Sequence, residues 1–135
     1  AWPDNTRILL VEDNHINQLV ATEMLRGVGC EPDIATNGLE AIEALQQAPD
    51  DTPFTLIFMD CQMPEMDGYE ASRQIRAGVA GINYQSIPII ALTANAMEGD
   101  RKSCLDAGMS DYLSKPIIPQ NLLTQLKRWL LDSVA

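Results

Sequence analysis

Positive charge, cysteine and long apolar segments are all scarce in this sequence. Lys and Arg number 9 against 19 Asp and Glu, and the resulting net charge of −10 argues against direct binding of nucleic acid or of an anionic membrane surface. No apolar run approaches the ~20 residues that cross a bilayer. The 3 cysteines are odd in number and widely spaced, so they indicate neither a disulfide framework nor a zinc site, and we expect a reducing cytoplasm.

The length and the ordinary composition indicate a folded domain with a single core. The chain has 135 residues, of which 46% are hydrophobic, and Gly and Pro contribute 8 each. We expect a linker over residues 1–5, one domain over residues 6–132 and a tail over residues 133–135. We also expect this domain to act as a monomer.

Apolar runs alternate with helical patterns along the chain, and this rhythm predicts an α/β fold, a parallel sheet with crossover helices. The expected strands cover residues 8–11, 32–36, 54–59, 88–92 and 111–114. The expected helices cover residues 14–28, 37–48, 67–77 and 97–107, with a last helix from residue 119 and a loop over residues 78–86. Asn37 and Asp67 have Glu three positions later, which is typical of helix N-caps.

The last helix and the second helix each carry an apolar stripe. In the second helix we expect three residues to face the core, namely Leu39, Ile42 and Leu45. In the last helix the expected buried stripe consists of Leu122, Leu126, Trp129 and Leu130.

Polar residues follow four of the five expected strands. They are Glu12 and Asp13 after the first strand, Asp60 after the third, Thr93 after the fourth and Lys115 after the fifth. Ligands of open parallel sheets bind outside the carboxyl ends of the strands, where the winding reverses. In the flavodoxin-like, doubly wound order 2-1-3-4-5, the first and third strands are neighbours roughly 4.8 Å apart, so Asp13 and Asp60 face one crevice. Lys115 starts about 10 Å from the third strand, a gap that its side chain can largely cross.

Three carboxylates in one crevice repel one another, because two unit charges at ~4 Å cost on the order of 4 kcal/mol at an effective dielectric near 20. The oxygen ligands, with no histidine or cysteine among them, favour Mg²⁺ or Mn²⁺ over zinc or copper. Mg²⁺ keeps positions for water and phosphate oxygens, so the pattern predicts a Mg²⁺ site with room for a phosphoryl group. The plainer alternative, that the acids are solvated helix caps, does not account for Thr93 and Lys115.

Several blocks of this sequence resemble the signature blocks of receiver domains from two-component signalling. The blocks lie at residues 11–14 (VEDN), 59–68 (MDCQMPEMDG), 91–94 (ALTA) and 115–116 (KP). The resemblance covers about residues 6–132. The variants at residues 14–18 and 91–96 look most like receivers attached to hybrid sensor histidine kinases.

The resemblance implies roles for the matching residues around the acidic crevice. Asp60 would be the phosphoacceptor, a carboxylate nucleophile that forms an aspartyl phosphate. Glu12 and Asp13 would hold Mg²⁺ together with Asp60 and the backbone carbonyl of Gln62. Lys115 would bind a phosphoryl oxygen as a point charge.

The resemblance also implies a switch. Thr93 would donate its hydroxyl to the phosphoryl group, and Tyr112, three positions before the lysine, matches the aromatic residue that then turns inward. Gln62 and Asn95 match positions that tune the lifetime of the phosphoryl group. The bond between Lys115 and Pro116 matches a peptide bond that is often cis in the family.

The implied function is that of a phosphoacceptor and switch domain in a phosphorelay. The phosphoryl group would come from the phosphohistidine domain of a histidine kinase and would be exchanged with a histidine phosphotransfer domain. The expected docking surface for that partner consists of Asn14, Ile16, Asn17 and Val20. The domain would promote its own phosphorylation and dephosphorylation without being a free-standing enzyme, and the resemblance places such domains in hybrid histidine kinases, in the cytoplasmic portion of a membrane sensor.

Three other functions would each require a different feature of the sequence or of the partner surface. A phosphohydrolase of the haloacid dehalogenase type would need a second aspartate two positions after the nucleophile, where this sequence has Gln62. A nucleotide-binding domain would need a phosphate loop, and no GxxxxGK[ST] motif is present. A dimerising or inhibitory module, in which phosphorylation is incidental, would contact its partner through the fourth and fifth helices.

Overall fold

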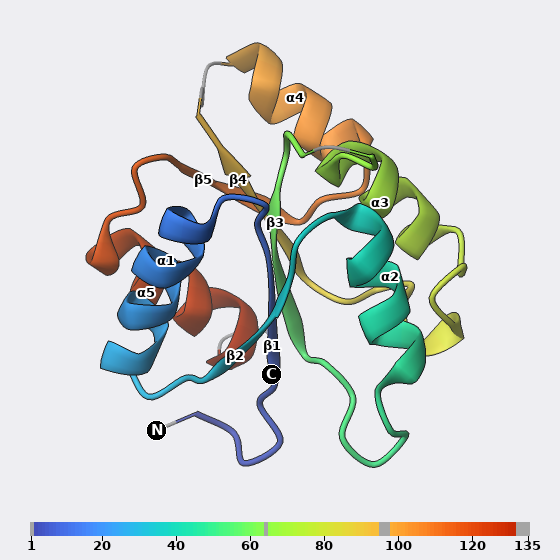
Figure 1. Ribbon diagram of the computed structural model, residues 1–135, viewed down its shortest axis with the longest axis horizontal. Coiled ribbons are helices and arrows are strands. Elements are labelled where there is room, and N and C mark those ends of the chain that lie inside the picture. The colour runs from blue at the N-terminus through green and yellow to red at the C-terminus, as the bar shows by residue number, and fades with distance from the viewer. Residues whose placement is uncertain (1, 64, 95–97, 132–135) are drawn as a thin grey trace.

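A five-stranded parallel sheet forms the centre of the computed structural model, which describes residues 2–63, 65–94 and 98–131 (Figure 1). The strands are β1 (Ile8–Val11), β2 (Pro32–Ala35), β3 (Leu56–Asp60), β4 (Ile89–Thr93) and β5 (Asp111–Ser114). Their order is β2-β1-β3-β4-β5, and every neighbouring pair is parallel. The prediction of a flavodoxin-like, doubly wound sheet is therefore confirmed.

Helices cover both faces of the sheet. They are α1 (His15–Gly27), α2 (Gly38–Gln47), α3 (Gly68–Arg76), α4 (Glu98–Asp106) and α5 (Pro119–Leu126). In Figure 1, α1 and α5 lie on one side of the sheet, and α2 and α3 lie on the other. Leu9 and Val11 of β1 join the core under α2 and α3, whereas Ile8 and Leu10 join the core under α1 and α5. A strand buried on both faces has no polar side, which explains its uninterrupted apolar run.

Side-chain caps fix where two of these helices begin. The Oδ1 atom of Asn37 accepts a hydrogen bond from the backbone N–H of Glu40 at 2.9 Å. The Oδ1 atom of Asp67 accepts one from the N–H of Glu70, also at 2.9 Å. Each bond satisfies an amide that has no partner within its own helix, so both predicted N-caps are confirmed.

The prediction that Leu39 faces the core is wrong, because its side chain is 43% exposed. Gly38, the residue before it, faces inward instead, and a Cβ atom there would meet Met66 of the loop before α3. Leu39 lies about 100° further round the helix, where its side chain is open to solvent. Ile42 and Leu45 are buried as expected.

The C-terminal helix and one loop also differ in detail from the sequence-based expectation. Leu122, Leu126 and Leu130 are buried, but Trp129 is only partly buried. The chain continues beyond α5 as a π-helical segment over Lys127–Leu131, which changes the spacing of the stripe. The expected loop over residues 78–86 contains a short 3₁₀ helix, Ile82–Tyr84. None of the helices in the described ranges is both long and apolar enough to cross a membrane.

Candidate functional site

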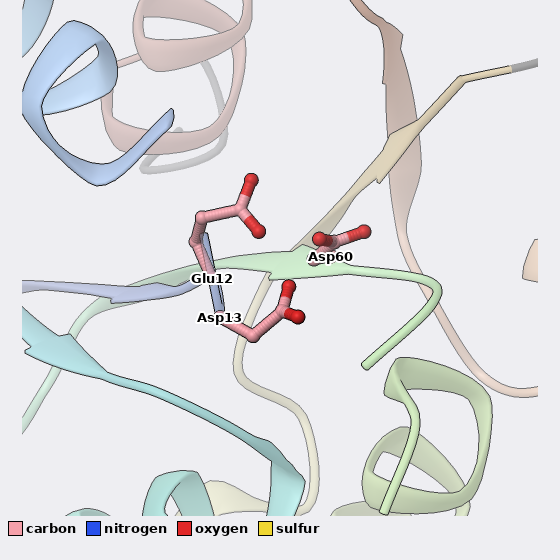
Figure 2. Close-up of side chains that lie close together, drawn as sticks. All are labelled: Glu12, Asp13 and Asp60. Carbon is pink, nitrogen blue, oxygen red and sulfur yellow. The ribbon is translucent and has the colours of Figure 1, made fainter. Parts of the chain in front are cut away.

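Three carboxylates gather at the carboxyl ends of β1 and β3 (Figure 2). Val11 pairs with Met59 in the register of these neighbouring strands, so Glu12, Asp13 and Asp60 leave the sheet at the same edge. One oxygen atom from each carboxylate lies within 4.8 Å of the others. The expectation that Asp13 and Asp60 share one crevice is confirmed, and Glu12 belongs to the same group.

The three acids differ in their exposure to solvent. Glu12 and Asp60 are 2% and 5% exposed, whereas Asp13 is exposed. The ammonium group of Lys115 lies between the two buried acids, with Nζ 3.1 Å from Oε1 of Glu12 and 3.0 Å from Oδ2 of Asp60. One lysine thus faces two buried carboxylates, so the negative charge of the cluster is only partly neutralised.

This arrangement shifts the protonation of two groups. Burial raises the pKa of Glu12, and the neighbouring carboxylate of Asp60 raises it further, while Lys115 acts in the opposite direction. Burial lowers the pKa of Lys115, but its hydrogen bonds and charge interactions with Asp60 and Glu12 outweigh burial and hold it above the ordinary value. The proton on Lys115 and the negative charge nearby therefore stabilise each other.

The acids, Lys115 and Thr93 line one cleft of about 290 Å³. Thr93 is the last residue of β4 and is buried, and its backbone carbonyl accepts a hydrogen bond from the N–H of Lys115 at 2.7 Å. Gln62 is exposed at the cleft, and its backbone N–H donates to Oδ1 of Asp60 at 3.2 Å. The peptide bond between Lys115 and Pro116 is cis, as the resemblance implied.

A glycine allows the loop after β3 to fold back onto Asp60. The N–H of Gly68 donates to the carbonyl of Cys61 at 3.2 Å. A Cβ atom at Gly68 would overlap the carbonyl oxygen of Asp60, so a larger residue does not fit there without a shift of the backbone. Glu65, in the same loop, has a φ of 66°. Gly68 therefore belongs to the supports of the site, and the sequence signal for it is the Asp-Gly pair at the start of α3.

Gln18 of α1 is a second support, and it is not among the residues predicted from the sequence. Its Nε2 atom donates a hydrogen bond of 2.7 Å to the backbone carbonyl of Glu12. No periodicity or spacing rule predicts such a bond, because it joins a side chain in a helix to the irregular turn before that helix. The only available signal is the Gln at the end of the block over residues 14–18.

The remaining predicted residues lie around the cleft or on α1. Asn14, Ile16, Asn17 and Val20 are exposed on the first turns of α1, and Ile16 is 69% exposed. Tyr112 of β5 is partly buried, and its ring lies 5.8 Å from the guanidinium carbon of Arg101. Asn95 lies outside the described residues. Cys61 is buried, with its Sγ atom 3.8 Å from that of Cys104.

The residues in the cleft fit a hard divalent cation. All side-chain donors in the acidic cluster are carboxylate oxygens, and they converge closely enough for one ion to contact more than one of them. Two of these carboxylates are almost fully buried with a single ammonium group between them, so the cluster retains negative charge for a cation to neutralise.

Most of this chain is similar to part of two sensor kinases. Sensor protein GacS of Pseudomonas syringae pv. syringae is 42% identical over 123 residues, and hybrid signal transduction histidine kinase L of Dictyostelium discoideum is 40% identical over 123 residues. Both matches cover 91% of this chain, which in turn covers 13% and 7% of the two relatives. The chain therefore spans only a small part of the length of these kinases.

Two solved structures share the fold over nearly the whole chain. The receiver domain of sensor histidine kinase PA1611 from Pseudomonas aeruginosa PAO1, with a magnesium ion coordinated in its active site cleft, is 45% identical with a TM-score of 0.81, and the match covers 93% of this chain and 97% of that one. A co-crystal structure from Saccharomyces cerevisiae joins the histidine phosphotransfer signaling protein Ypd1 to the receiver domain of its downstream response regulator Ssk1. Its match is 32% identical with a TM-score of 0.85, and covers 100% of this chain and 94% of that one.

The sequence itself matches the response regulator receiver domain family over residues 8–127. This range contains all five strands, the acidic cluster, Thr93 and Lys115. With 120 of its residues matched, close similarity to receivers of histidine kinases and the fold of solved receiver domains, the chain belongs to the response regulator receiver domain family.

Proposed function

We propose that this receiver domain accepts a phosphoryl group on Asp60 with the help of Mg²⁺ and exchanges it within a phosphorelay. The observation that carries the proposal is the position of Asp60. Its buried carboxylate lies within one cluster with Glu12 and Asp13, and its Oδ2 atom is 3.0 Å from Nζ of Lys115. This geometry supports the proposal, because phosphoryl transfer requires a nucleophile, ligands for a metal ion and a positive charge around one cleft.

Each residue has a definite task in the proposed reaction. A carboxylate oxygen of Asp60 forms a bond to phosphorus while the bond between phosphorus and the imidazole nitrogen of the donor breaks. Lys115 releases its hydrogen bond to Asp60 and donates to an oxygen of the transferred group. Glu12 and Asp13, with Asp60 and the carbonyl of Gln62, are the proposed Mg²⁺ ligands. Bound Mg²⁺ supplies neutralisation of the charge on the phosphoryl oxygens, and Mn²⁺ has the same preference for oxygen ligands.

The switch proposal concerns Thr93 and Tyr112. A phosphoryl group on Asp60 adds charge and hydrogen-bond acceptors at the cleft that Thr93 lines. We propose that the hydroxyl of Thr93 moves toward these acceptors and that the ring of Tyr112 then packs further inward. Tyr112 is already partly buried against the core under α2 and α3, so only a modest movement is needed. Gln62 and Asn95 are proposed to control how long the phosphoryl group persists.

A histidine phosphotransfer domain is the proposed partner, and the α1 residues Asn14, Ile16, Asn17 and Val20 are its proposed docking surface. Asn14 and Asn17 line the cleft, and the apolar side chains of Ile16 and Val20 are exposed on the same turns of α1, which favours a partner that covers them. The structural relative Ssk1 is bound to a histidine phosphotransfer protein, which supports this class of partner. The donor histidine would have to reach Asp60, and docking beside the cleft allows this.

The unit that acts is proposed to be residues 6–132, with a linker at residues 1–5 and a tail at residues 133–135. Trp2 donates a hydrogen bond from its indole N–H to the carbonyl of Val28 at 2.6 Å, so this part of the linker contacts the domain. We infer a monomeric domain in the cytoplasm, as part of a hybrid histidine kinase. Cys30, Cys61 and Cys104 are buried and form no disulfide, which is consistent with a reducing compartment.

Labelling with a small phosphodonor tests the central claim. Incubation with acetyl phosphate and Mg²⁺ should add one phosphoryl group per chain, as measured by intact mass, and Asp60→Asn should abolish the addition. Asp51→Asn is the matched control, because it removes an exposed aspartate from the loop before β3. Persistent labelling of Asp60→Asn would refute the assignment. Repeated turnover of a small phosphate ester would favour a phosphohydrolase instead.

The docking surface has its own test. Ile16→Asp should slow phosphoryl transfer from the receiver to a phosphotransfer domain at least tenfold without changing labelling by acetyl phosphate. Ile82→Asp is the control, because Ile82 is 80% exposed on the 3₁₀ helix after α3, away from α1. If chemical-shift changes caused by the partner cluster on α4 and α5, the proposed docking surface is wrong.

A further inference from the structure

Gln18 connects α1 to the turn that carries two of the three clustered acids. Its Nε2 atom donates to the carbonyl of Glu12 at 2.7 Å, and its backbone N–H donates to the carbonyl of Asn14 at 2.9 Å. One residue of α1 therefore holds both ends of the segment Glu12–Asn14. Asp13 is the residue between them.

The carbonyl of Glu12 lies one residue beyond the paired part of β1. The pairing of β1 with both of its neighbours ends at Val11, and the N–H of Glu12 donates to Ala35 at 3.0 Å. Past this point the ladder no longer orients the backbone. The side-chain amide of Gln18 instead donates a hydrogen bond to the carbonyl of Glu12. This is the position where the chain must turn to present Asp13.

Asp13 needs such support more than the other two acids. Glu12 and Asp60 are enclosed by the core and share Lys115, whereas Asp13 is exposed and its position depends on the backbone that carries it. Repulsion from the two buried carboxylates favours rotation of Asp13 away from the cluster, because like charges at ~4 Å repel appreciably even near a protein surface. A fixed turn holds the backbone that carries Asp13, so that its side chain can rotate but the residue as a whole does not shift away from the cluster.

Resting on the proposed function, we propose that Gln18 is a positioning residue for the Mg²⁺ site, which acts by fixing the turn at Glu12 and Asp13. It does not contact the cleft as a ligand. Its effect passes through the carbonyl of Glu12, so it holds the acids in the geometry that a cation requires before the cation arrives. Preformed geometry of this kind raises metal affinity, because less ordering has to accompany binding.

The test compares two glutamines that make the same kind of bond. Gln18→Met keeps the length of the side chain and removes the donor. Gln46→Met is the matched control, because Nε2 of Gln46 donates to the carbonyl of Val79 at 3.0 Å on a surface that does not line the cleft. Calorimetric titration with MgCl₂ alone, without any phosphodonor, should show an affinity about three- to tenfold weaker for Gln18→Met and unchanged for Gln46→Met.

Two further measurements separate positioning from general stability. In the metal-free protein, amide hydrogen exchange at residues 13 and 14 should be faster in Gln18→Met, while exchange in β3 and β4 should match the wild type. Labelling by acetyl phosphate should be slower at low Mg²⁺ and should recover at saturating Mg²⁺. An affinity for Mg²⁺ equal to that of the wild type, or losses of stability and affinity that are the same in both variants, would overturn the inference about Gln18. Neither outcome bears on Asp60, whose role is tested separately by Asp60→Asn.

Discussion

The Nζ atom of Lys115 lies 3.0 Å from Oδ2 of Asp60, although the two residues are 55 positions apart. Asp60 ends β3 and Lys115 follows β5, and β4 lies between these two strands. The same ammonium group lies 3.1 Å from the carboxylate of Glu12. Lys115 therefore does two things in the resting domain: it neutralises part of the acidic cluster, and it holds a donor beside the proposed nucleophile. The first role is one of stability and the second is one of function, and they can be separated experimentally.

Removal of Lys115 should destabilise the metal-free domain. In Lys115→Met two almost fully buried carboxylates lose their cationic partner, and we expect the free energy of unfolding at pH 7 to fall by about 1–3 kcal/mol. Saturating Mg²⁺ should reduce this deficit, because a cation neutralises the same charges. Urea denaturation with and without MgCl₂ measures both effects.

Arg26→Met is the control for the Lys115 variant. It breaks an ion pair with Glu31 of 2.7 Å, but both side chains are largely exposed, so the unfolding free energy should change far less. Equal losses in the two variants, or a deficit in Lys115→Met that Mg²⁺ does not reduce, would contradict the described role of Lys115.

A methyl group at Gly68 should displace the loop that packs against the backbone of Asp60. The Cβ atom in Gly68→Ala would overlap the carbonyl oxygen of Asp60, so the loop has to shift, and we expect a loss of stability of about 1–3 kcal/mol together with slower labelling by acetyl phosphate. Gly27→Ala is the matched control at the end of α1, where the added methyl group would have no atom within 4 Å apart from its own helix backbone and chain neighbours. It should be neutral or stabilise the domain by up to about 1 kcal/mol.

Mg²⁺ affinity should weaken as the pH falls through the pKa of Glu12. Burial and then Asp60 raise this pKa, so protonation competes with Mg²⁺ at a higher pH than for an ordinary glutamate. Titration calorimetry between pH 8 and pH 5 checks this, and Glu12→Gln should bind more weakly with a flatter pH profile. Glu23→Gln, an exposed change on α1, should keep the wild-type profile. A constant affinity across this range in the wild type would contradict the prediction.

The raised pKa values of Glu12 and Lys115 also determine how the stability of the metal-free domain changes with pH. The folded state binds the proton of Glu12 more tightly than the unfolded state does, so this contribution is full below the unfolded pKa and is lost as the pH rises through the folded pKa. The pKa of Lys115 is also raised, so its contribution persists through neutral pH and is lost only in the alkaline range. The contributions of Glu12 and Lys115 to metal-free stability should therefore decrease with rising pH in two separate windows.

Cys61 should be inert toward alkylation in the folded domain. Burial raises the pKa of its thiol to about 12, so only roughly one thiol in ten thousand is ionised at pH 8. Iodoacetamide should modify Cys61 only under unfolding conditions, as followed by peptide mass. Ile16→Cys supplies an exposed comparison on α1 and should react within minutes in the native state. Rapid native modification of Cys61 would show that the surroundings of Asp60 open readily.

Much of the fold follows from local patterns. The uninterrupted apolar runs of β1 and β3 predict strands buried on both faces, and Asn37 and Asp67 predict where two helices begin, because capping depends only on residues a few positions apart. The error at Leu39 has a tertiary cause, since the close approach of Met66 to Gly38 determines which side of α2 faces inward. The spacing of apolar residues within one helix carries no information about that contact.

The sequence alone determined which chemistry is present at this site: carboxylates, a threonine and a lysine placed where parallel strands end. Only the tertiary structure decided that Glu12 is buried and the adjacent Asp13 exposed, that Lys115 contacts two acids rather than one, and that Gln18 supports the turn. The physical reason is the separation along the sequence over which each interaction acts. Strand and cap signals act over a few residues, whereas burial, charge pairing and side-chain support depend on groups that meet only after the sheet has assembled.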